Sequence, residues 1–205
     1  MFTGIVQTIG EVAAIDGGAD KRIEILAPGL DFATGDSIAV NGCCLTVAAV
    51  MEGGFAADVS RETLACTTLG GWMRGMPVNL EAAAKPATLL GGHLVLGHVD
   101  GVGAIRERHD DARSVRLKIE LPAALARYIA AKGSVCIDGV SLTVNETGGA
   151  HFGVNIVPYT LDHTVIRDYA PGTRVNIECD IIARYVERLL DGAAAAPMML
   201  MDGAV

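Results

Sequence analysis

The chain contains one sequence of roughly 100 residues written twice, a length typical of a small domain. The segment 35–47 returns 97 positions later as 132–144, with the same Leu-Thr-Val block and the same order of Gly and β-branched residues. This period is too long for a solenoid repeat. We therefore predict two similar domains, at residues 1–93 and 94–185, which offer two similar pockets. Such an arrangement suits a reaction between two like molecules.

Short β-branched runs separated by Gly, Asp and Asn predict an all-β fold, either a sandwich or a barrel. Asn41-Gly42 and Asp138-Gly139 lie inside matched runs, and both pairs favour the same tight hairpin turn. The runs are 38–47, 55–59 and 78–80 in the first copy and 135–144, 152–157 and 175–177 in the second.

Two segments have helical patterns. The segment from Pro122 to Ala131 starts with Pro and carries apolar residues at helical spacing, so it predicts a short helix. From Ile181 to Leu190 an apolar stripe predicts a C-terminal helix, which we place at 181–191. Because this stripe lies outside both repeats, we expect it to pack against another chain; the alternative is that it folds back on its own barrel. We predict a frayed tail at 192–205.

Composition excludes several classes of protein. The net charge of −8 and the pI of about 5.0 argue against a nucleic-acid-binding surface. No secretory signal and no apolar stretch of 18 residues is visible, so we predict no membrane association. The five cysteines show no CxxC spacing, which indicates a reducing cytoplasm and no structural zinc. Neither GxGxxG nor a P-loop motif is present.

Matched positions that differ between the copies show where the two pockets diverge. Neutral drift explains any single exchange, but it explains poorly their clustering beside identical Gly and Leu-Thr-Val anchors. His98 is a candidate pocket residue because it replaces an apolar residue, whereas we expect His93 to be structural. Cys43 and Cys44 face opposite sides of a strand, so one is predicted to be core and the other pocket. The exchanged pairs are Ile5 with His98, Gly35 with Lys132, Asn41 with Asp138, Cys44 with Ser141, Asp58 with Asn155, Arg61 with Pro158 and Glu62 with Tyr159.

Six motifs together resemble the duplicated lumazine-binding barrel family of riboflavin synthase alpha chains. The resemblance runs from residue 1 to about 190 and includes the duplication itself. The motifs are Met1-Phe2-Thr3-Gly4-Ile5-Val6, Asn41-Gly42-Cys43-Cys44-Leu45-Thr46-Val47, Glu62-Thr63-Leu64, the glycine- and histidine-rich stretch 91–101, Asp138-Gly139-Val140-Ser141-Leu142-Thr143-Val144-Asn145 and Ala183-Arg184-Tyr185-Val186-Glu187-Arg188-Leu189.

The resemblance implies tandem six-stranded Greek-key β-barrels followed by a C-terminal helix that joins three copies into a homotrimer. It implies a transferase that dismutates two molecules of 6,7-dimethyl-8-ribityllumazine into riboflavin and 5-amino-6-(ribitylamino)uracil, with no metal and no cofactor. It also implies that the paired site forms between neighbouring subunits, with Phe2 near the junction and closing the pocket. Association with lumazine synthase is a further partner expectation.

Both copies are expected to contribute equivalent stretches to the site. The candidate catalytic residues are Phe2, Cys44, His98, Lys132 and Ser141. The substrate-binding residues predicted for the first barrel are Gly4, Ile5, Val6, Cys44, Leu45, Thr46, Asp58, Val59, Ser60, Arg61, Glu62 and Thr63. Those predicted for the second barrel are Gly97, His98, Val99, Lys132, Ser141, Leu142, Thr143, Asn155, Ile156, Val157, Pro158, Tyr159 and Thr160, of which Tyr159 stands where the family often has His.

Two other functions compete with the enzyme. Antenna proteins of luminous bacteria share the duplicated fold and hold a lumazine or flavin without converting it, and in them the second pocket decays. Here His98, Lys132, Ser141 and Thr143 are all present, which favours the enzyme. A purely structural β-barrel is disfavoured by the unequal polar residues of the two copies.

Overall fold

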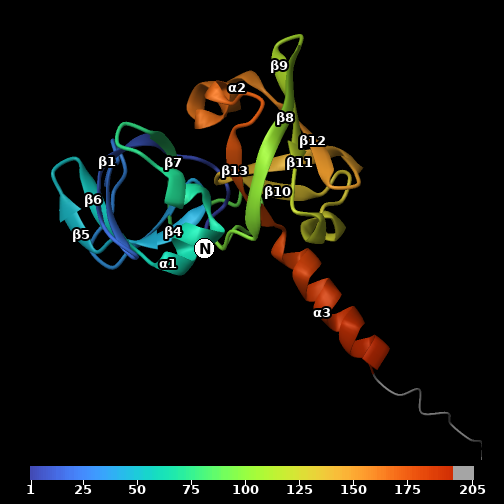
Figure 1. Ribbon diagram of the computed structural model, residues 1–205, viewed down its shortest axis with the longest axis horizontal. Coiled ribbons are helices and arrows are strands. Elements are labelled where there is room, and N and C mark those ends of the chain that lie inside the picture. Colours follow the sequence, from blue (N-terminus) through green and yellow to red (C-terminus); the bar gives the residue numbers. More distant parts are fainter. Residues whose placement is uncertain (196–205) are drawn as a thin grey trace, which may run out of the picture.

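A computed structural model describes residues 1–195, and it contains two β units side by side, followed by a helix that extends away from them (Figure 1). The first unit forms one sheet in the order β4-β3-β7-β1-β2-β6-β5. Its elements are β1 (Thr8–Gly17), β2 (Lys21–Leu26), β3 (Ser37–Val40), β4 (Cys43–Thr46), β5 (Ala49–Met51), β6 (Gly54–Val59), α1 (Arg61–Cys66), η1 (Thr68–Gly71) and β7 (Pro77–Ala82).

The second unit is a closed barrel of six strands in the order β10-β11-β12-β9-β8-β13. Three consecutive strands, β10 to β12, are joined in sequence, and β13 returns to pair with β10, which is a Greek key. The elements are β8 (Gly101–Asp111), β9 (Ser114–Glu120), η2 (Ala123–Tyr128), β10 (Ser134–Ile137), β11 (Val140–Gly148), β12 (His151–Ile156), α2 (Pro158–His163), η3 (Val165–Asp168), β13 (Arg174–Cys179) and α3 (Ile181–Ala195). The predicted all-β class is confirmed.

The two units differ at one point. In the second, β11 is continuous and changes register between Val144 and Glu146, whereas the matched stretch of the first is divided into β4 and β5. The first unit therefore has seven strands where six were predicted. The gap between β4 and β5 matches the position of this register shift in β11. A bulge disrupts the pairing of a strand and bends it, so the same feature interrupts the strand in one copy and only shifts its register in the other.

The predicted hairpin turns are confirmed. Asn41 and Asp138 have φ of 43° and 44°, and the glycine after each also has a positive φ, as this tight turn requires. The helix predicted at 122–131 is a 3-10 helix, η2, which begins directly after Pro122. The predicted C-terminal helix is confirmed as α3, but it continues to Ala195, past the expected end at 191, because its final residues are mostly alanine. The remainder of the predicted tail, 196–205, lies outside the described residues.

Each unit has its own buried core, and a third cluster fills the junction between them. The side chain of Phe2 is fully buried in this junction with Ala39, Val95 and Cys136. Phe2 and Val95 occupy matched positions of the two copies, and their backbones pair with each other through N–H···O distances of 2.7 and 3.1 Å. The two copies therefore meet through equivalent residues.

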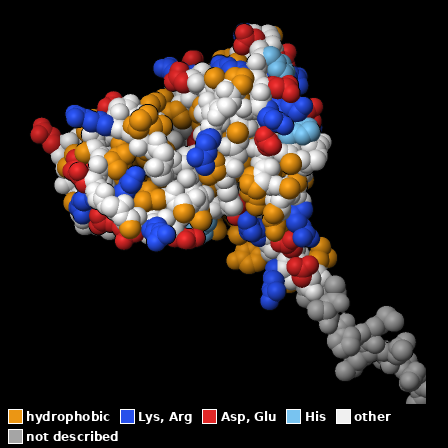
Figure 2. All heavy atoms as spheres, viewed as in Figure 1, with side chains coloured by type: hydrophobic (Ala, Val, Ile, Leu, Met, Phe, Trp, Pro, Cys, Tyr) orange, Lys and Arg blue, Asp and Glu red, His pale blue; other side chains and the backbone are white. Residues whose placement is uncertain are grey.

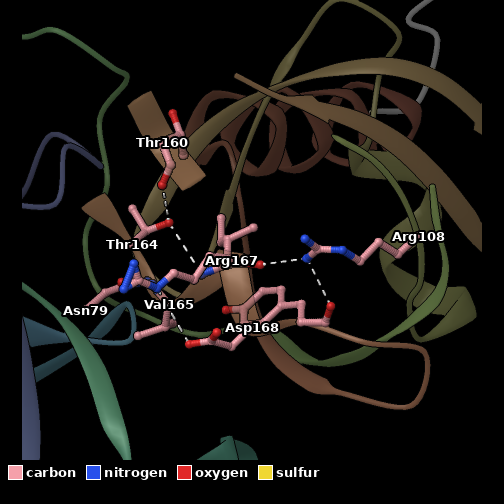
Figure 3. A network of polar contacts seen from close by, with 9 residues as sticks. Asn79, Arg108, Thr160, Thr164, Val165, Arg167 and Asp168 are labelled. Carbon is pink, nitrogen blue, oxygen red and sulfur yellow. Dashed lines mark hydrogen bonds and ion pairs between the residues drawn. The ribbon is translucent and has the colours of Figure 1, made fainter. Parts of the chain in front are cut away.

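The junction is reciprocal in its polar contacts as well. The side-chain amide of Asn79 donates to the carbonyl of Asp138, and that of the matched Asn176 donates to the carbonyl of Asn41, both at 2.8 Å. Asn79 also accepts a hydrogen bond from the Val165 backbone at 2.9 Å, and at the other end of this network Arg108 donates to the carbonyls of Ile166 and Tyr169 (Figure 3). These buried and mutually satisfied amides fix how the two units are oriented.

Candidate functional site

Two short segments cross from one unit to the other, and they define where the candidate pockets lie. The Gly4 carbonyl accepts from the Ser141 backbone at 2.7 Å, and the matched Gly97 carbonyl accepts from the Cys44 backbone at 2.9 Å. The N-terminal segment therefore contacts the second barrel, while the segment around Gly97 contacts the first.

This crossing corrects the predicted grouping of the site. We expected Gly4-Ile5-Val6 beside Cys44 in the first barrel, but Val6 packs against the core of the second unit. Conversely, Val99 packs against the core of the first unit, and Gly97 pairs with Cys44, so His98 lies next to the strand that carries Cys44. Matched sequence cannot distinguish contacts within a copy from contacts across copies, because both link equivalent positions.

Two buried glutamates hold the crossing segments in place. Glu81, at the end of β7, accepts from the backbone N–H groups of Thr3 and Gly4 at 2.7 and 3.0 Å. The matched Glu178 accepts from Leu96 and Gly97 at 2.7 and 2.9 Å. Burial raises the pKa of Glu178 to about 7, although these backbone donors favour its charged form. Each unit thus ends in a carboxyl group that fixes the first turn of a crossing segment.

The first candidate pocket combines the edge of β4 with the crossing segment of the second copy. Cys44 is half-buried and Thr46 is exposed, while Cys43 and Leu45 point into the core, as the alternation of a strand requires. His98 is exposed beside this edge. The prediction that one of the two cysteines is core is confirmed for Cys43, and Cys44 stays a candidate pocket residue.

Further candidates follow at the end of β6, which contacts β4. Asp58 pairs with Arg22 at 3.0 Å on the surface, and Val59 points into the core. Ser60 caps α1 by accepting from the Thr63 backbone at 3.2 Å. Arg61 and Glu62 are exposed in the first turn of this helix, and the Glu62 carboxylate accepts from Cys66 at 3.2 Å.

The second candidate pocket has the matched arrangement with different side chains. Thr143 is exposed on β11, Leu142 is core, and Asn155 lies on the neighbouring strand β12. The side-chain oxygen of Asn155 is buried without a hydrogen-bond partner in the described chain, so a ligand that donates there would satisfy it. Ile156 points into the core, and the exposed Val157, Pro158 and Tyr159 lead into α2, where Tyr159 stacks on His163 with centroids 4.0 Å apart. Thr160 is half-buried and accepts from Thr164 through its carbonyl.

His93 was predicted to be structural, yet its ring contacts a candidate pocket residue. Its Nδ1 lies 2.7 Å from the Ser141 hydroxyl, and its Nε2 is buried without a partner in the described chain. Burial lowers the pKa of His93, which favours the neutral ring, and in one tautomer its Nδ1 can accept a hydrogen bond from the Ser141 hydroxyl. The two glycines before His93 were the available signal, because Gly92 lies so close to Ser141 that a Cβ there would be 2.7 Å from its Cβ.

Two predicted catalytic residues lie in other settings. The side chain of Phe2 is buried in the junction, so it supports the crossing segments from beneath and does not form an exposed cover. Lys132 is exposed in the turn before β10, with a φ of 67° and its backbone N–H donating to Val144 at 2.8 Å. Its matched residue is Gly35, which makes the same backbone contact to Val47.

A separate cleft of about 390 Å³ lies between the two units. It is lined by residues of both copies, including the matched pairs Asn41 with Asp138 and Trp72 with Tyr169. Asp138 is fully enclosed, accepts from the Tyr169 hydroxyl, and has a pKa that burial raises to about 7. None of the predicted substrate-binding residues lines this cleft.

Neither a metal centre nor a spanning helix appears in the part of the chain that the structure describes. No three His, Cys, Asp or Glu side chains among residues 1–195 gather closely enough to hold a metal ion. Across the same residues, no helix combines the length and the apolar character needed to cross a membrane.

Comparison with known proteins places this doubled site in a class. The lumazine binding domain family matches the chain twice, over residues 3–83 and 96–180, so the protein is a tandem lumazine-binding domain protein. The riboflavin synthase of Photobacterium phosphoreum is 45% identical over 194 residues, covering 93% of this chain and 89% of the relative. The riboflavin synthase of Mycobacterium tuberculosis is 46% identical over 200 residues, covering 94% and 100%. The chain belongs to the riboflavin synthase family.

Solved structures give the same fold. LumP complexed with riboflavin has a TM-score of 0.80 at 26% identity, covering 87% of this chain and 99% of LumP. LumP complexed with 6,7-dimethyl-8-(1'-D-ribityl) lumazine has a TM-score of 0.78 at 25% identity, with the same coverage. The sequence-based resemblance is confirmed.

Proposed function

We propose that the chain is a transferase that dismutates two molecules of 6,7-dimethyl-8-ribityllumazine into riboflavin and 5-amino-6-(ribitylamino)uracil. One lumazine donates a four-carbon unit and the other accepts it. The observation that carries the proposal is the doubled site in a chain 42–46% identical to riboflavin synthases from several bacteria. Each copy retains a pocket-edge threonine, Thr46 or Thr143, together with a crossing segment fixed by a buried glutamate.

Within each pocket, backbone groups and hydroxyls would orient the substrate. Edge-strand N–H and C=O groups can hydrogen-bond the pyrimidine-dione, and the exposed hydroxyls of Thr46 and Thr143 can donate or accept. Asn155, with its unpaired buried oxygen, offers an additional acceptor in the second pocket. Residues 1–93 and 94–185 would thus act as two lumazine-binding domains.

The chemistry needs orientation and modest proton transfer. Holding two lumazines face to face replaces a bimolecular encounter and can lower the barrier by several kcal/mol. The 7-methyl group is acidic because its carbanion delocalises into the ring, so a weak base suffices once water is excluded. His98 in the first pocket and the His93–Ser141 pair in the second are the candidate groups for moving protons. We propose that no metal or cofactor takes part.

Assembly is the second part of the proposal. Apolar side chains of α3 stay exposed, among them Tyr185 and Leu189, which are 67% and 73% exposed. Figure 2 shows apolar side chains alongside charged ones on the part of α3 nearest the barrels. We propose that α3 joins three chains, so that the first pocket of one subunit faces the second pocket of its neighbour. We place the trimer in the cytoplasm and propose lumazine synthase as a further partner.

An antenna function is the alternative, because the LumP structures share the fold and hold riboflavin or a lumazine. The two functions differ in turnover. We expect the purified protein, mixed with 6,7-dimethyl-8-ribityllumazine, to produce flavin absorbance and the uracil product in equal amounts. Tight binding of the lumazine without any product would establish the antenna function, and neither binding nor product would contradict both.

A further inference from the structure

Gln7 and Asp100 occupy matched positions in the two copies and perform one task in common. The side-chain oxygen of Gln7 accepts from the Ala82 backbone at 2.9 Å, at the end of β7. One oxygen of Asp100 accepts from the Cys179 backbone at 2.7 Å, at the matched end of β13. An amide therefore suffices for this contact, and the carboxylate of the second copy needs a separate explanation.

The second oxygen of Asp100 supplies that explanation, because it pairs with Arg184 of α3. Arg184 also lies over the Tyr128 ring, 4.8 Å from its centroid. One turn further along, Glu187 accepts from the Tyr128 hydroxyl and pairs with Arg127 at 2.8 Å. These contacts hold the first turns of α3 against Asp100 and η2. Since the Asp100 side chain is only 12% exposed, its charge is partly desolvated and needs this partner.

Asp100 also ends the crossing segment that carries His98. Upstream, Gly97 is fixed by Glu178 and by the Cys44 backbone. Downstream, the Asp100 backbone donates to Ile177 at 2.8 Å. His98 therefore lies between two residues held by hydrogen bonds, Gly97 and Asp100, and Asp100 also pairs with Arg184 of α3. A helix at the end of the second copy is in this way connected to the pocket of the first.

We propose that Asp100 and Arg184 are positioning residues that couple the packing of α3 against the second barrel to the placement of His98 in the first pocket. The proposal rests on the proposed function for its kinetic part only. Because the pair acts through the backbone of the crossing segment, its loss should reduce kcat more than it changes KM. A purely structural anchor for the helix would leave His98 unaffected.

The test uses Asp100→Asn, Arg184→Gln and the double variant in the full-length protein, with Arg188→Gln as the control. Asp100→Asn keeps an acceptor for Cys179, as Gln7 does for Ala82, so folding should be retained. Arg188 is exposed on the same helix. We expect each single variant to lower kcat on the order of tenfold. The kcat of the double variant should be no lower than that of the slower single variant, and the control should match the wild type.

Histidine NMR separates this proposal from the proposed function. With labelled histidine, and His98 assigned through His98→Gln, the His98 ring signal should shift in both single variants and not in Arg188→Gln. This readout holds even if the wild type shows no turnover. The proposal is overturned if folded Asp100→Asn and Arg184→Gln proteins keep the wild-type His98 signal, or if their effects on kcat simply multiply in the double variant. If Asp100→Asn does not fold, Arg184→Gln alone decides between the two outcomes.

Discussion

Asp138 and Asn41 occupy the same corner of the two copies, yet only Asp138 can titrate. Asn41 accepts from the Asn79 backbone at 2.7 Å, and Asp138 accepts from the Asn176 backbone at 2.8 Å. Burial raises the pKa of Asp138 from 3.8 to about 7, which means that the folded state favours the protonated acid. The contribution of this group to stability is fully present below pH 3.8 and is lost as the pH rises through about 7.

Replacing Asp138 with Asn should therefore flatten the dependence of stability on pH. We expect the wild type to lose more of its free energy of unfolding than Asp138→Asn between pH 5.5 and 8.5, because the amide carries no charge at either pH. Urea unfolding at the two values measures the difference. Equal losses in the two proteins would mean that Asp138 is ionised throughout this range.

The polar exchanges at Cys44, His98 and Ser141 should have unequal effects on catalysis. We expect at least one of Cys44→Ala, His98→Gln and Ser141→Ala to lower turnover more than tenfold, or roughly 1.4 kcal/mol of transition-state stabilisation. Because the Ser141 hydroxyl is hydrogen-bonded to His93, His93→Gln should change kcat and KM in the same way as Ser141→Ala. If all of these variants kept at least half the wild-type rate, catalysis would rest on proximity alone.

Phe2 is expected to affect stability as well as turnover. A residue near a chain end is usually mobile, which suggests that shortening its side chain leaves the melting temperature unchanged. Full burial of the ring corrects this expectation, since removing a buried Phe side chain costs about 3–5 kcal/mol. Thermal unfolding should therefore show a clear drop for Phe2→Ala and a smaller one for Phe2→Leu. An unchanged midpoint would show that the junction does not need the ring.

At the scale of elements, the crossing segments depend on glycine at one contact in each copy. Gly97 has a φ of +78°, and a Cβ there would lie 2.6 Å from the Cβ of Cys44. We expect Gly97→Ala to destabilise the protein by about 2 kcal/mol or more and to weaken ligand binding in the first pocket. Gly18→Ala is the matched control, because no atom lies within 4 Å of its Cβ. Ligand titration and unfolding of both variants decide the point.

Sequence predicts the elements better than it predicts their partners. The hairpins at Asn41 and Asp138 and the helix at 181 were predictable, because local turn chemistry and apolar spacing determine them. The exchange of the crossing segments was not, since Gly4 and Gly97 fit either unit by pattern. The contact of His93 with Ser141 also depends on this exchange, as Thr3 and Gly92 pack beside it.

At the scale of the whole molecule, the proposed trimer depends on the exposed apolar side of α3. Arg184 and Glu187 on its polar face contact Asp100 and Tyr128 of the second unit, whereas Leu189 and Leu190 remain exposed. We expect Leu189→Arg to shift the sedimentation coefficient from that of a trimer to that of a monomer, while the circular dichroism of the barrels is unchanged. An unaltered sedimentation profile would exclude this face of α3 as the interface.

The crossing of the two segments also makes the order of synthesis matter. The Asn41 carbonyl accepts a hydrogen bond from the side chain of Asn176, 135 residues later, and the Gly4 carbonyl accepts one from the Ser141 backbone. Gly97, which pairs with Cys44 of the first unit, is held by Glu178 of β13, and the same strand pairs with β10 and β8 in the second barrel. We therefore expect both candidate pockets to be completed only after β13 has been synthesised.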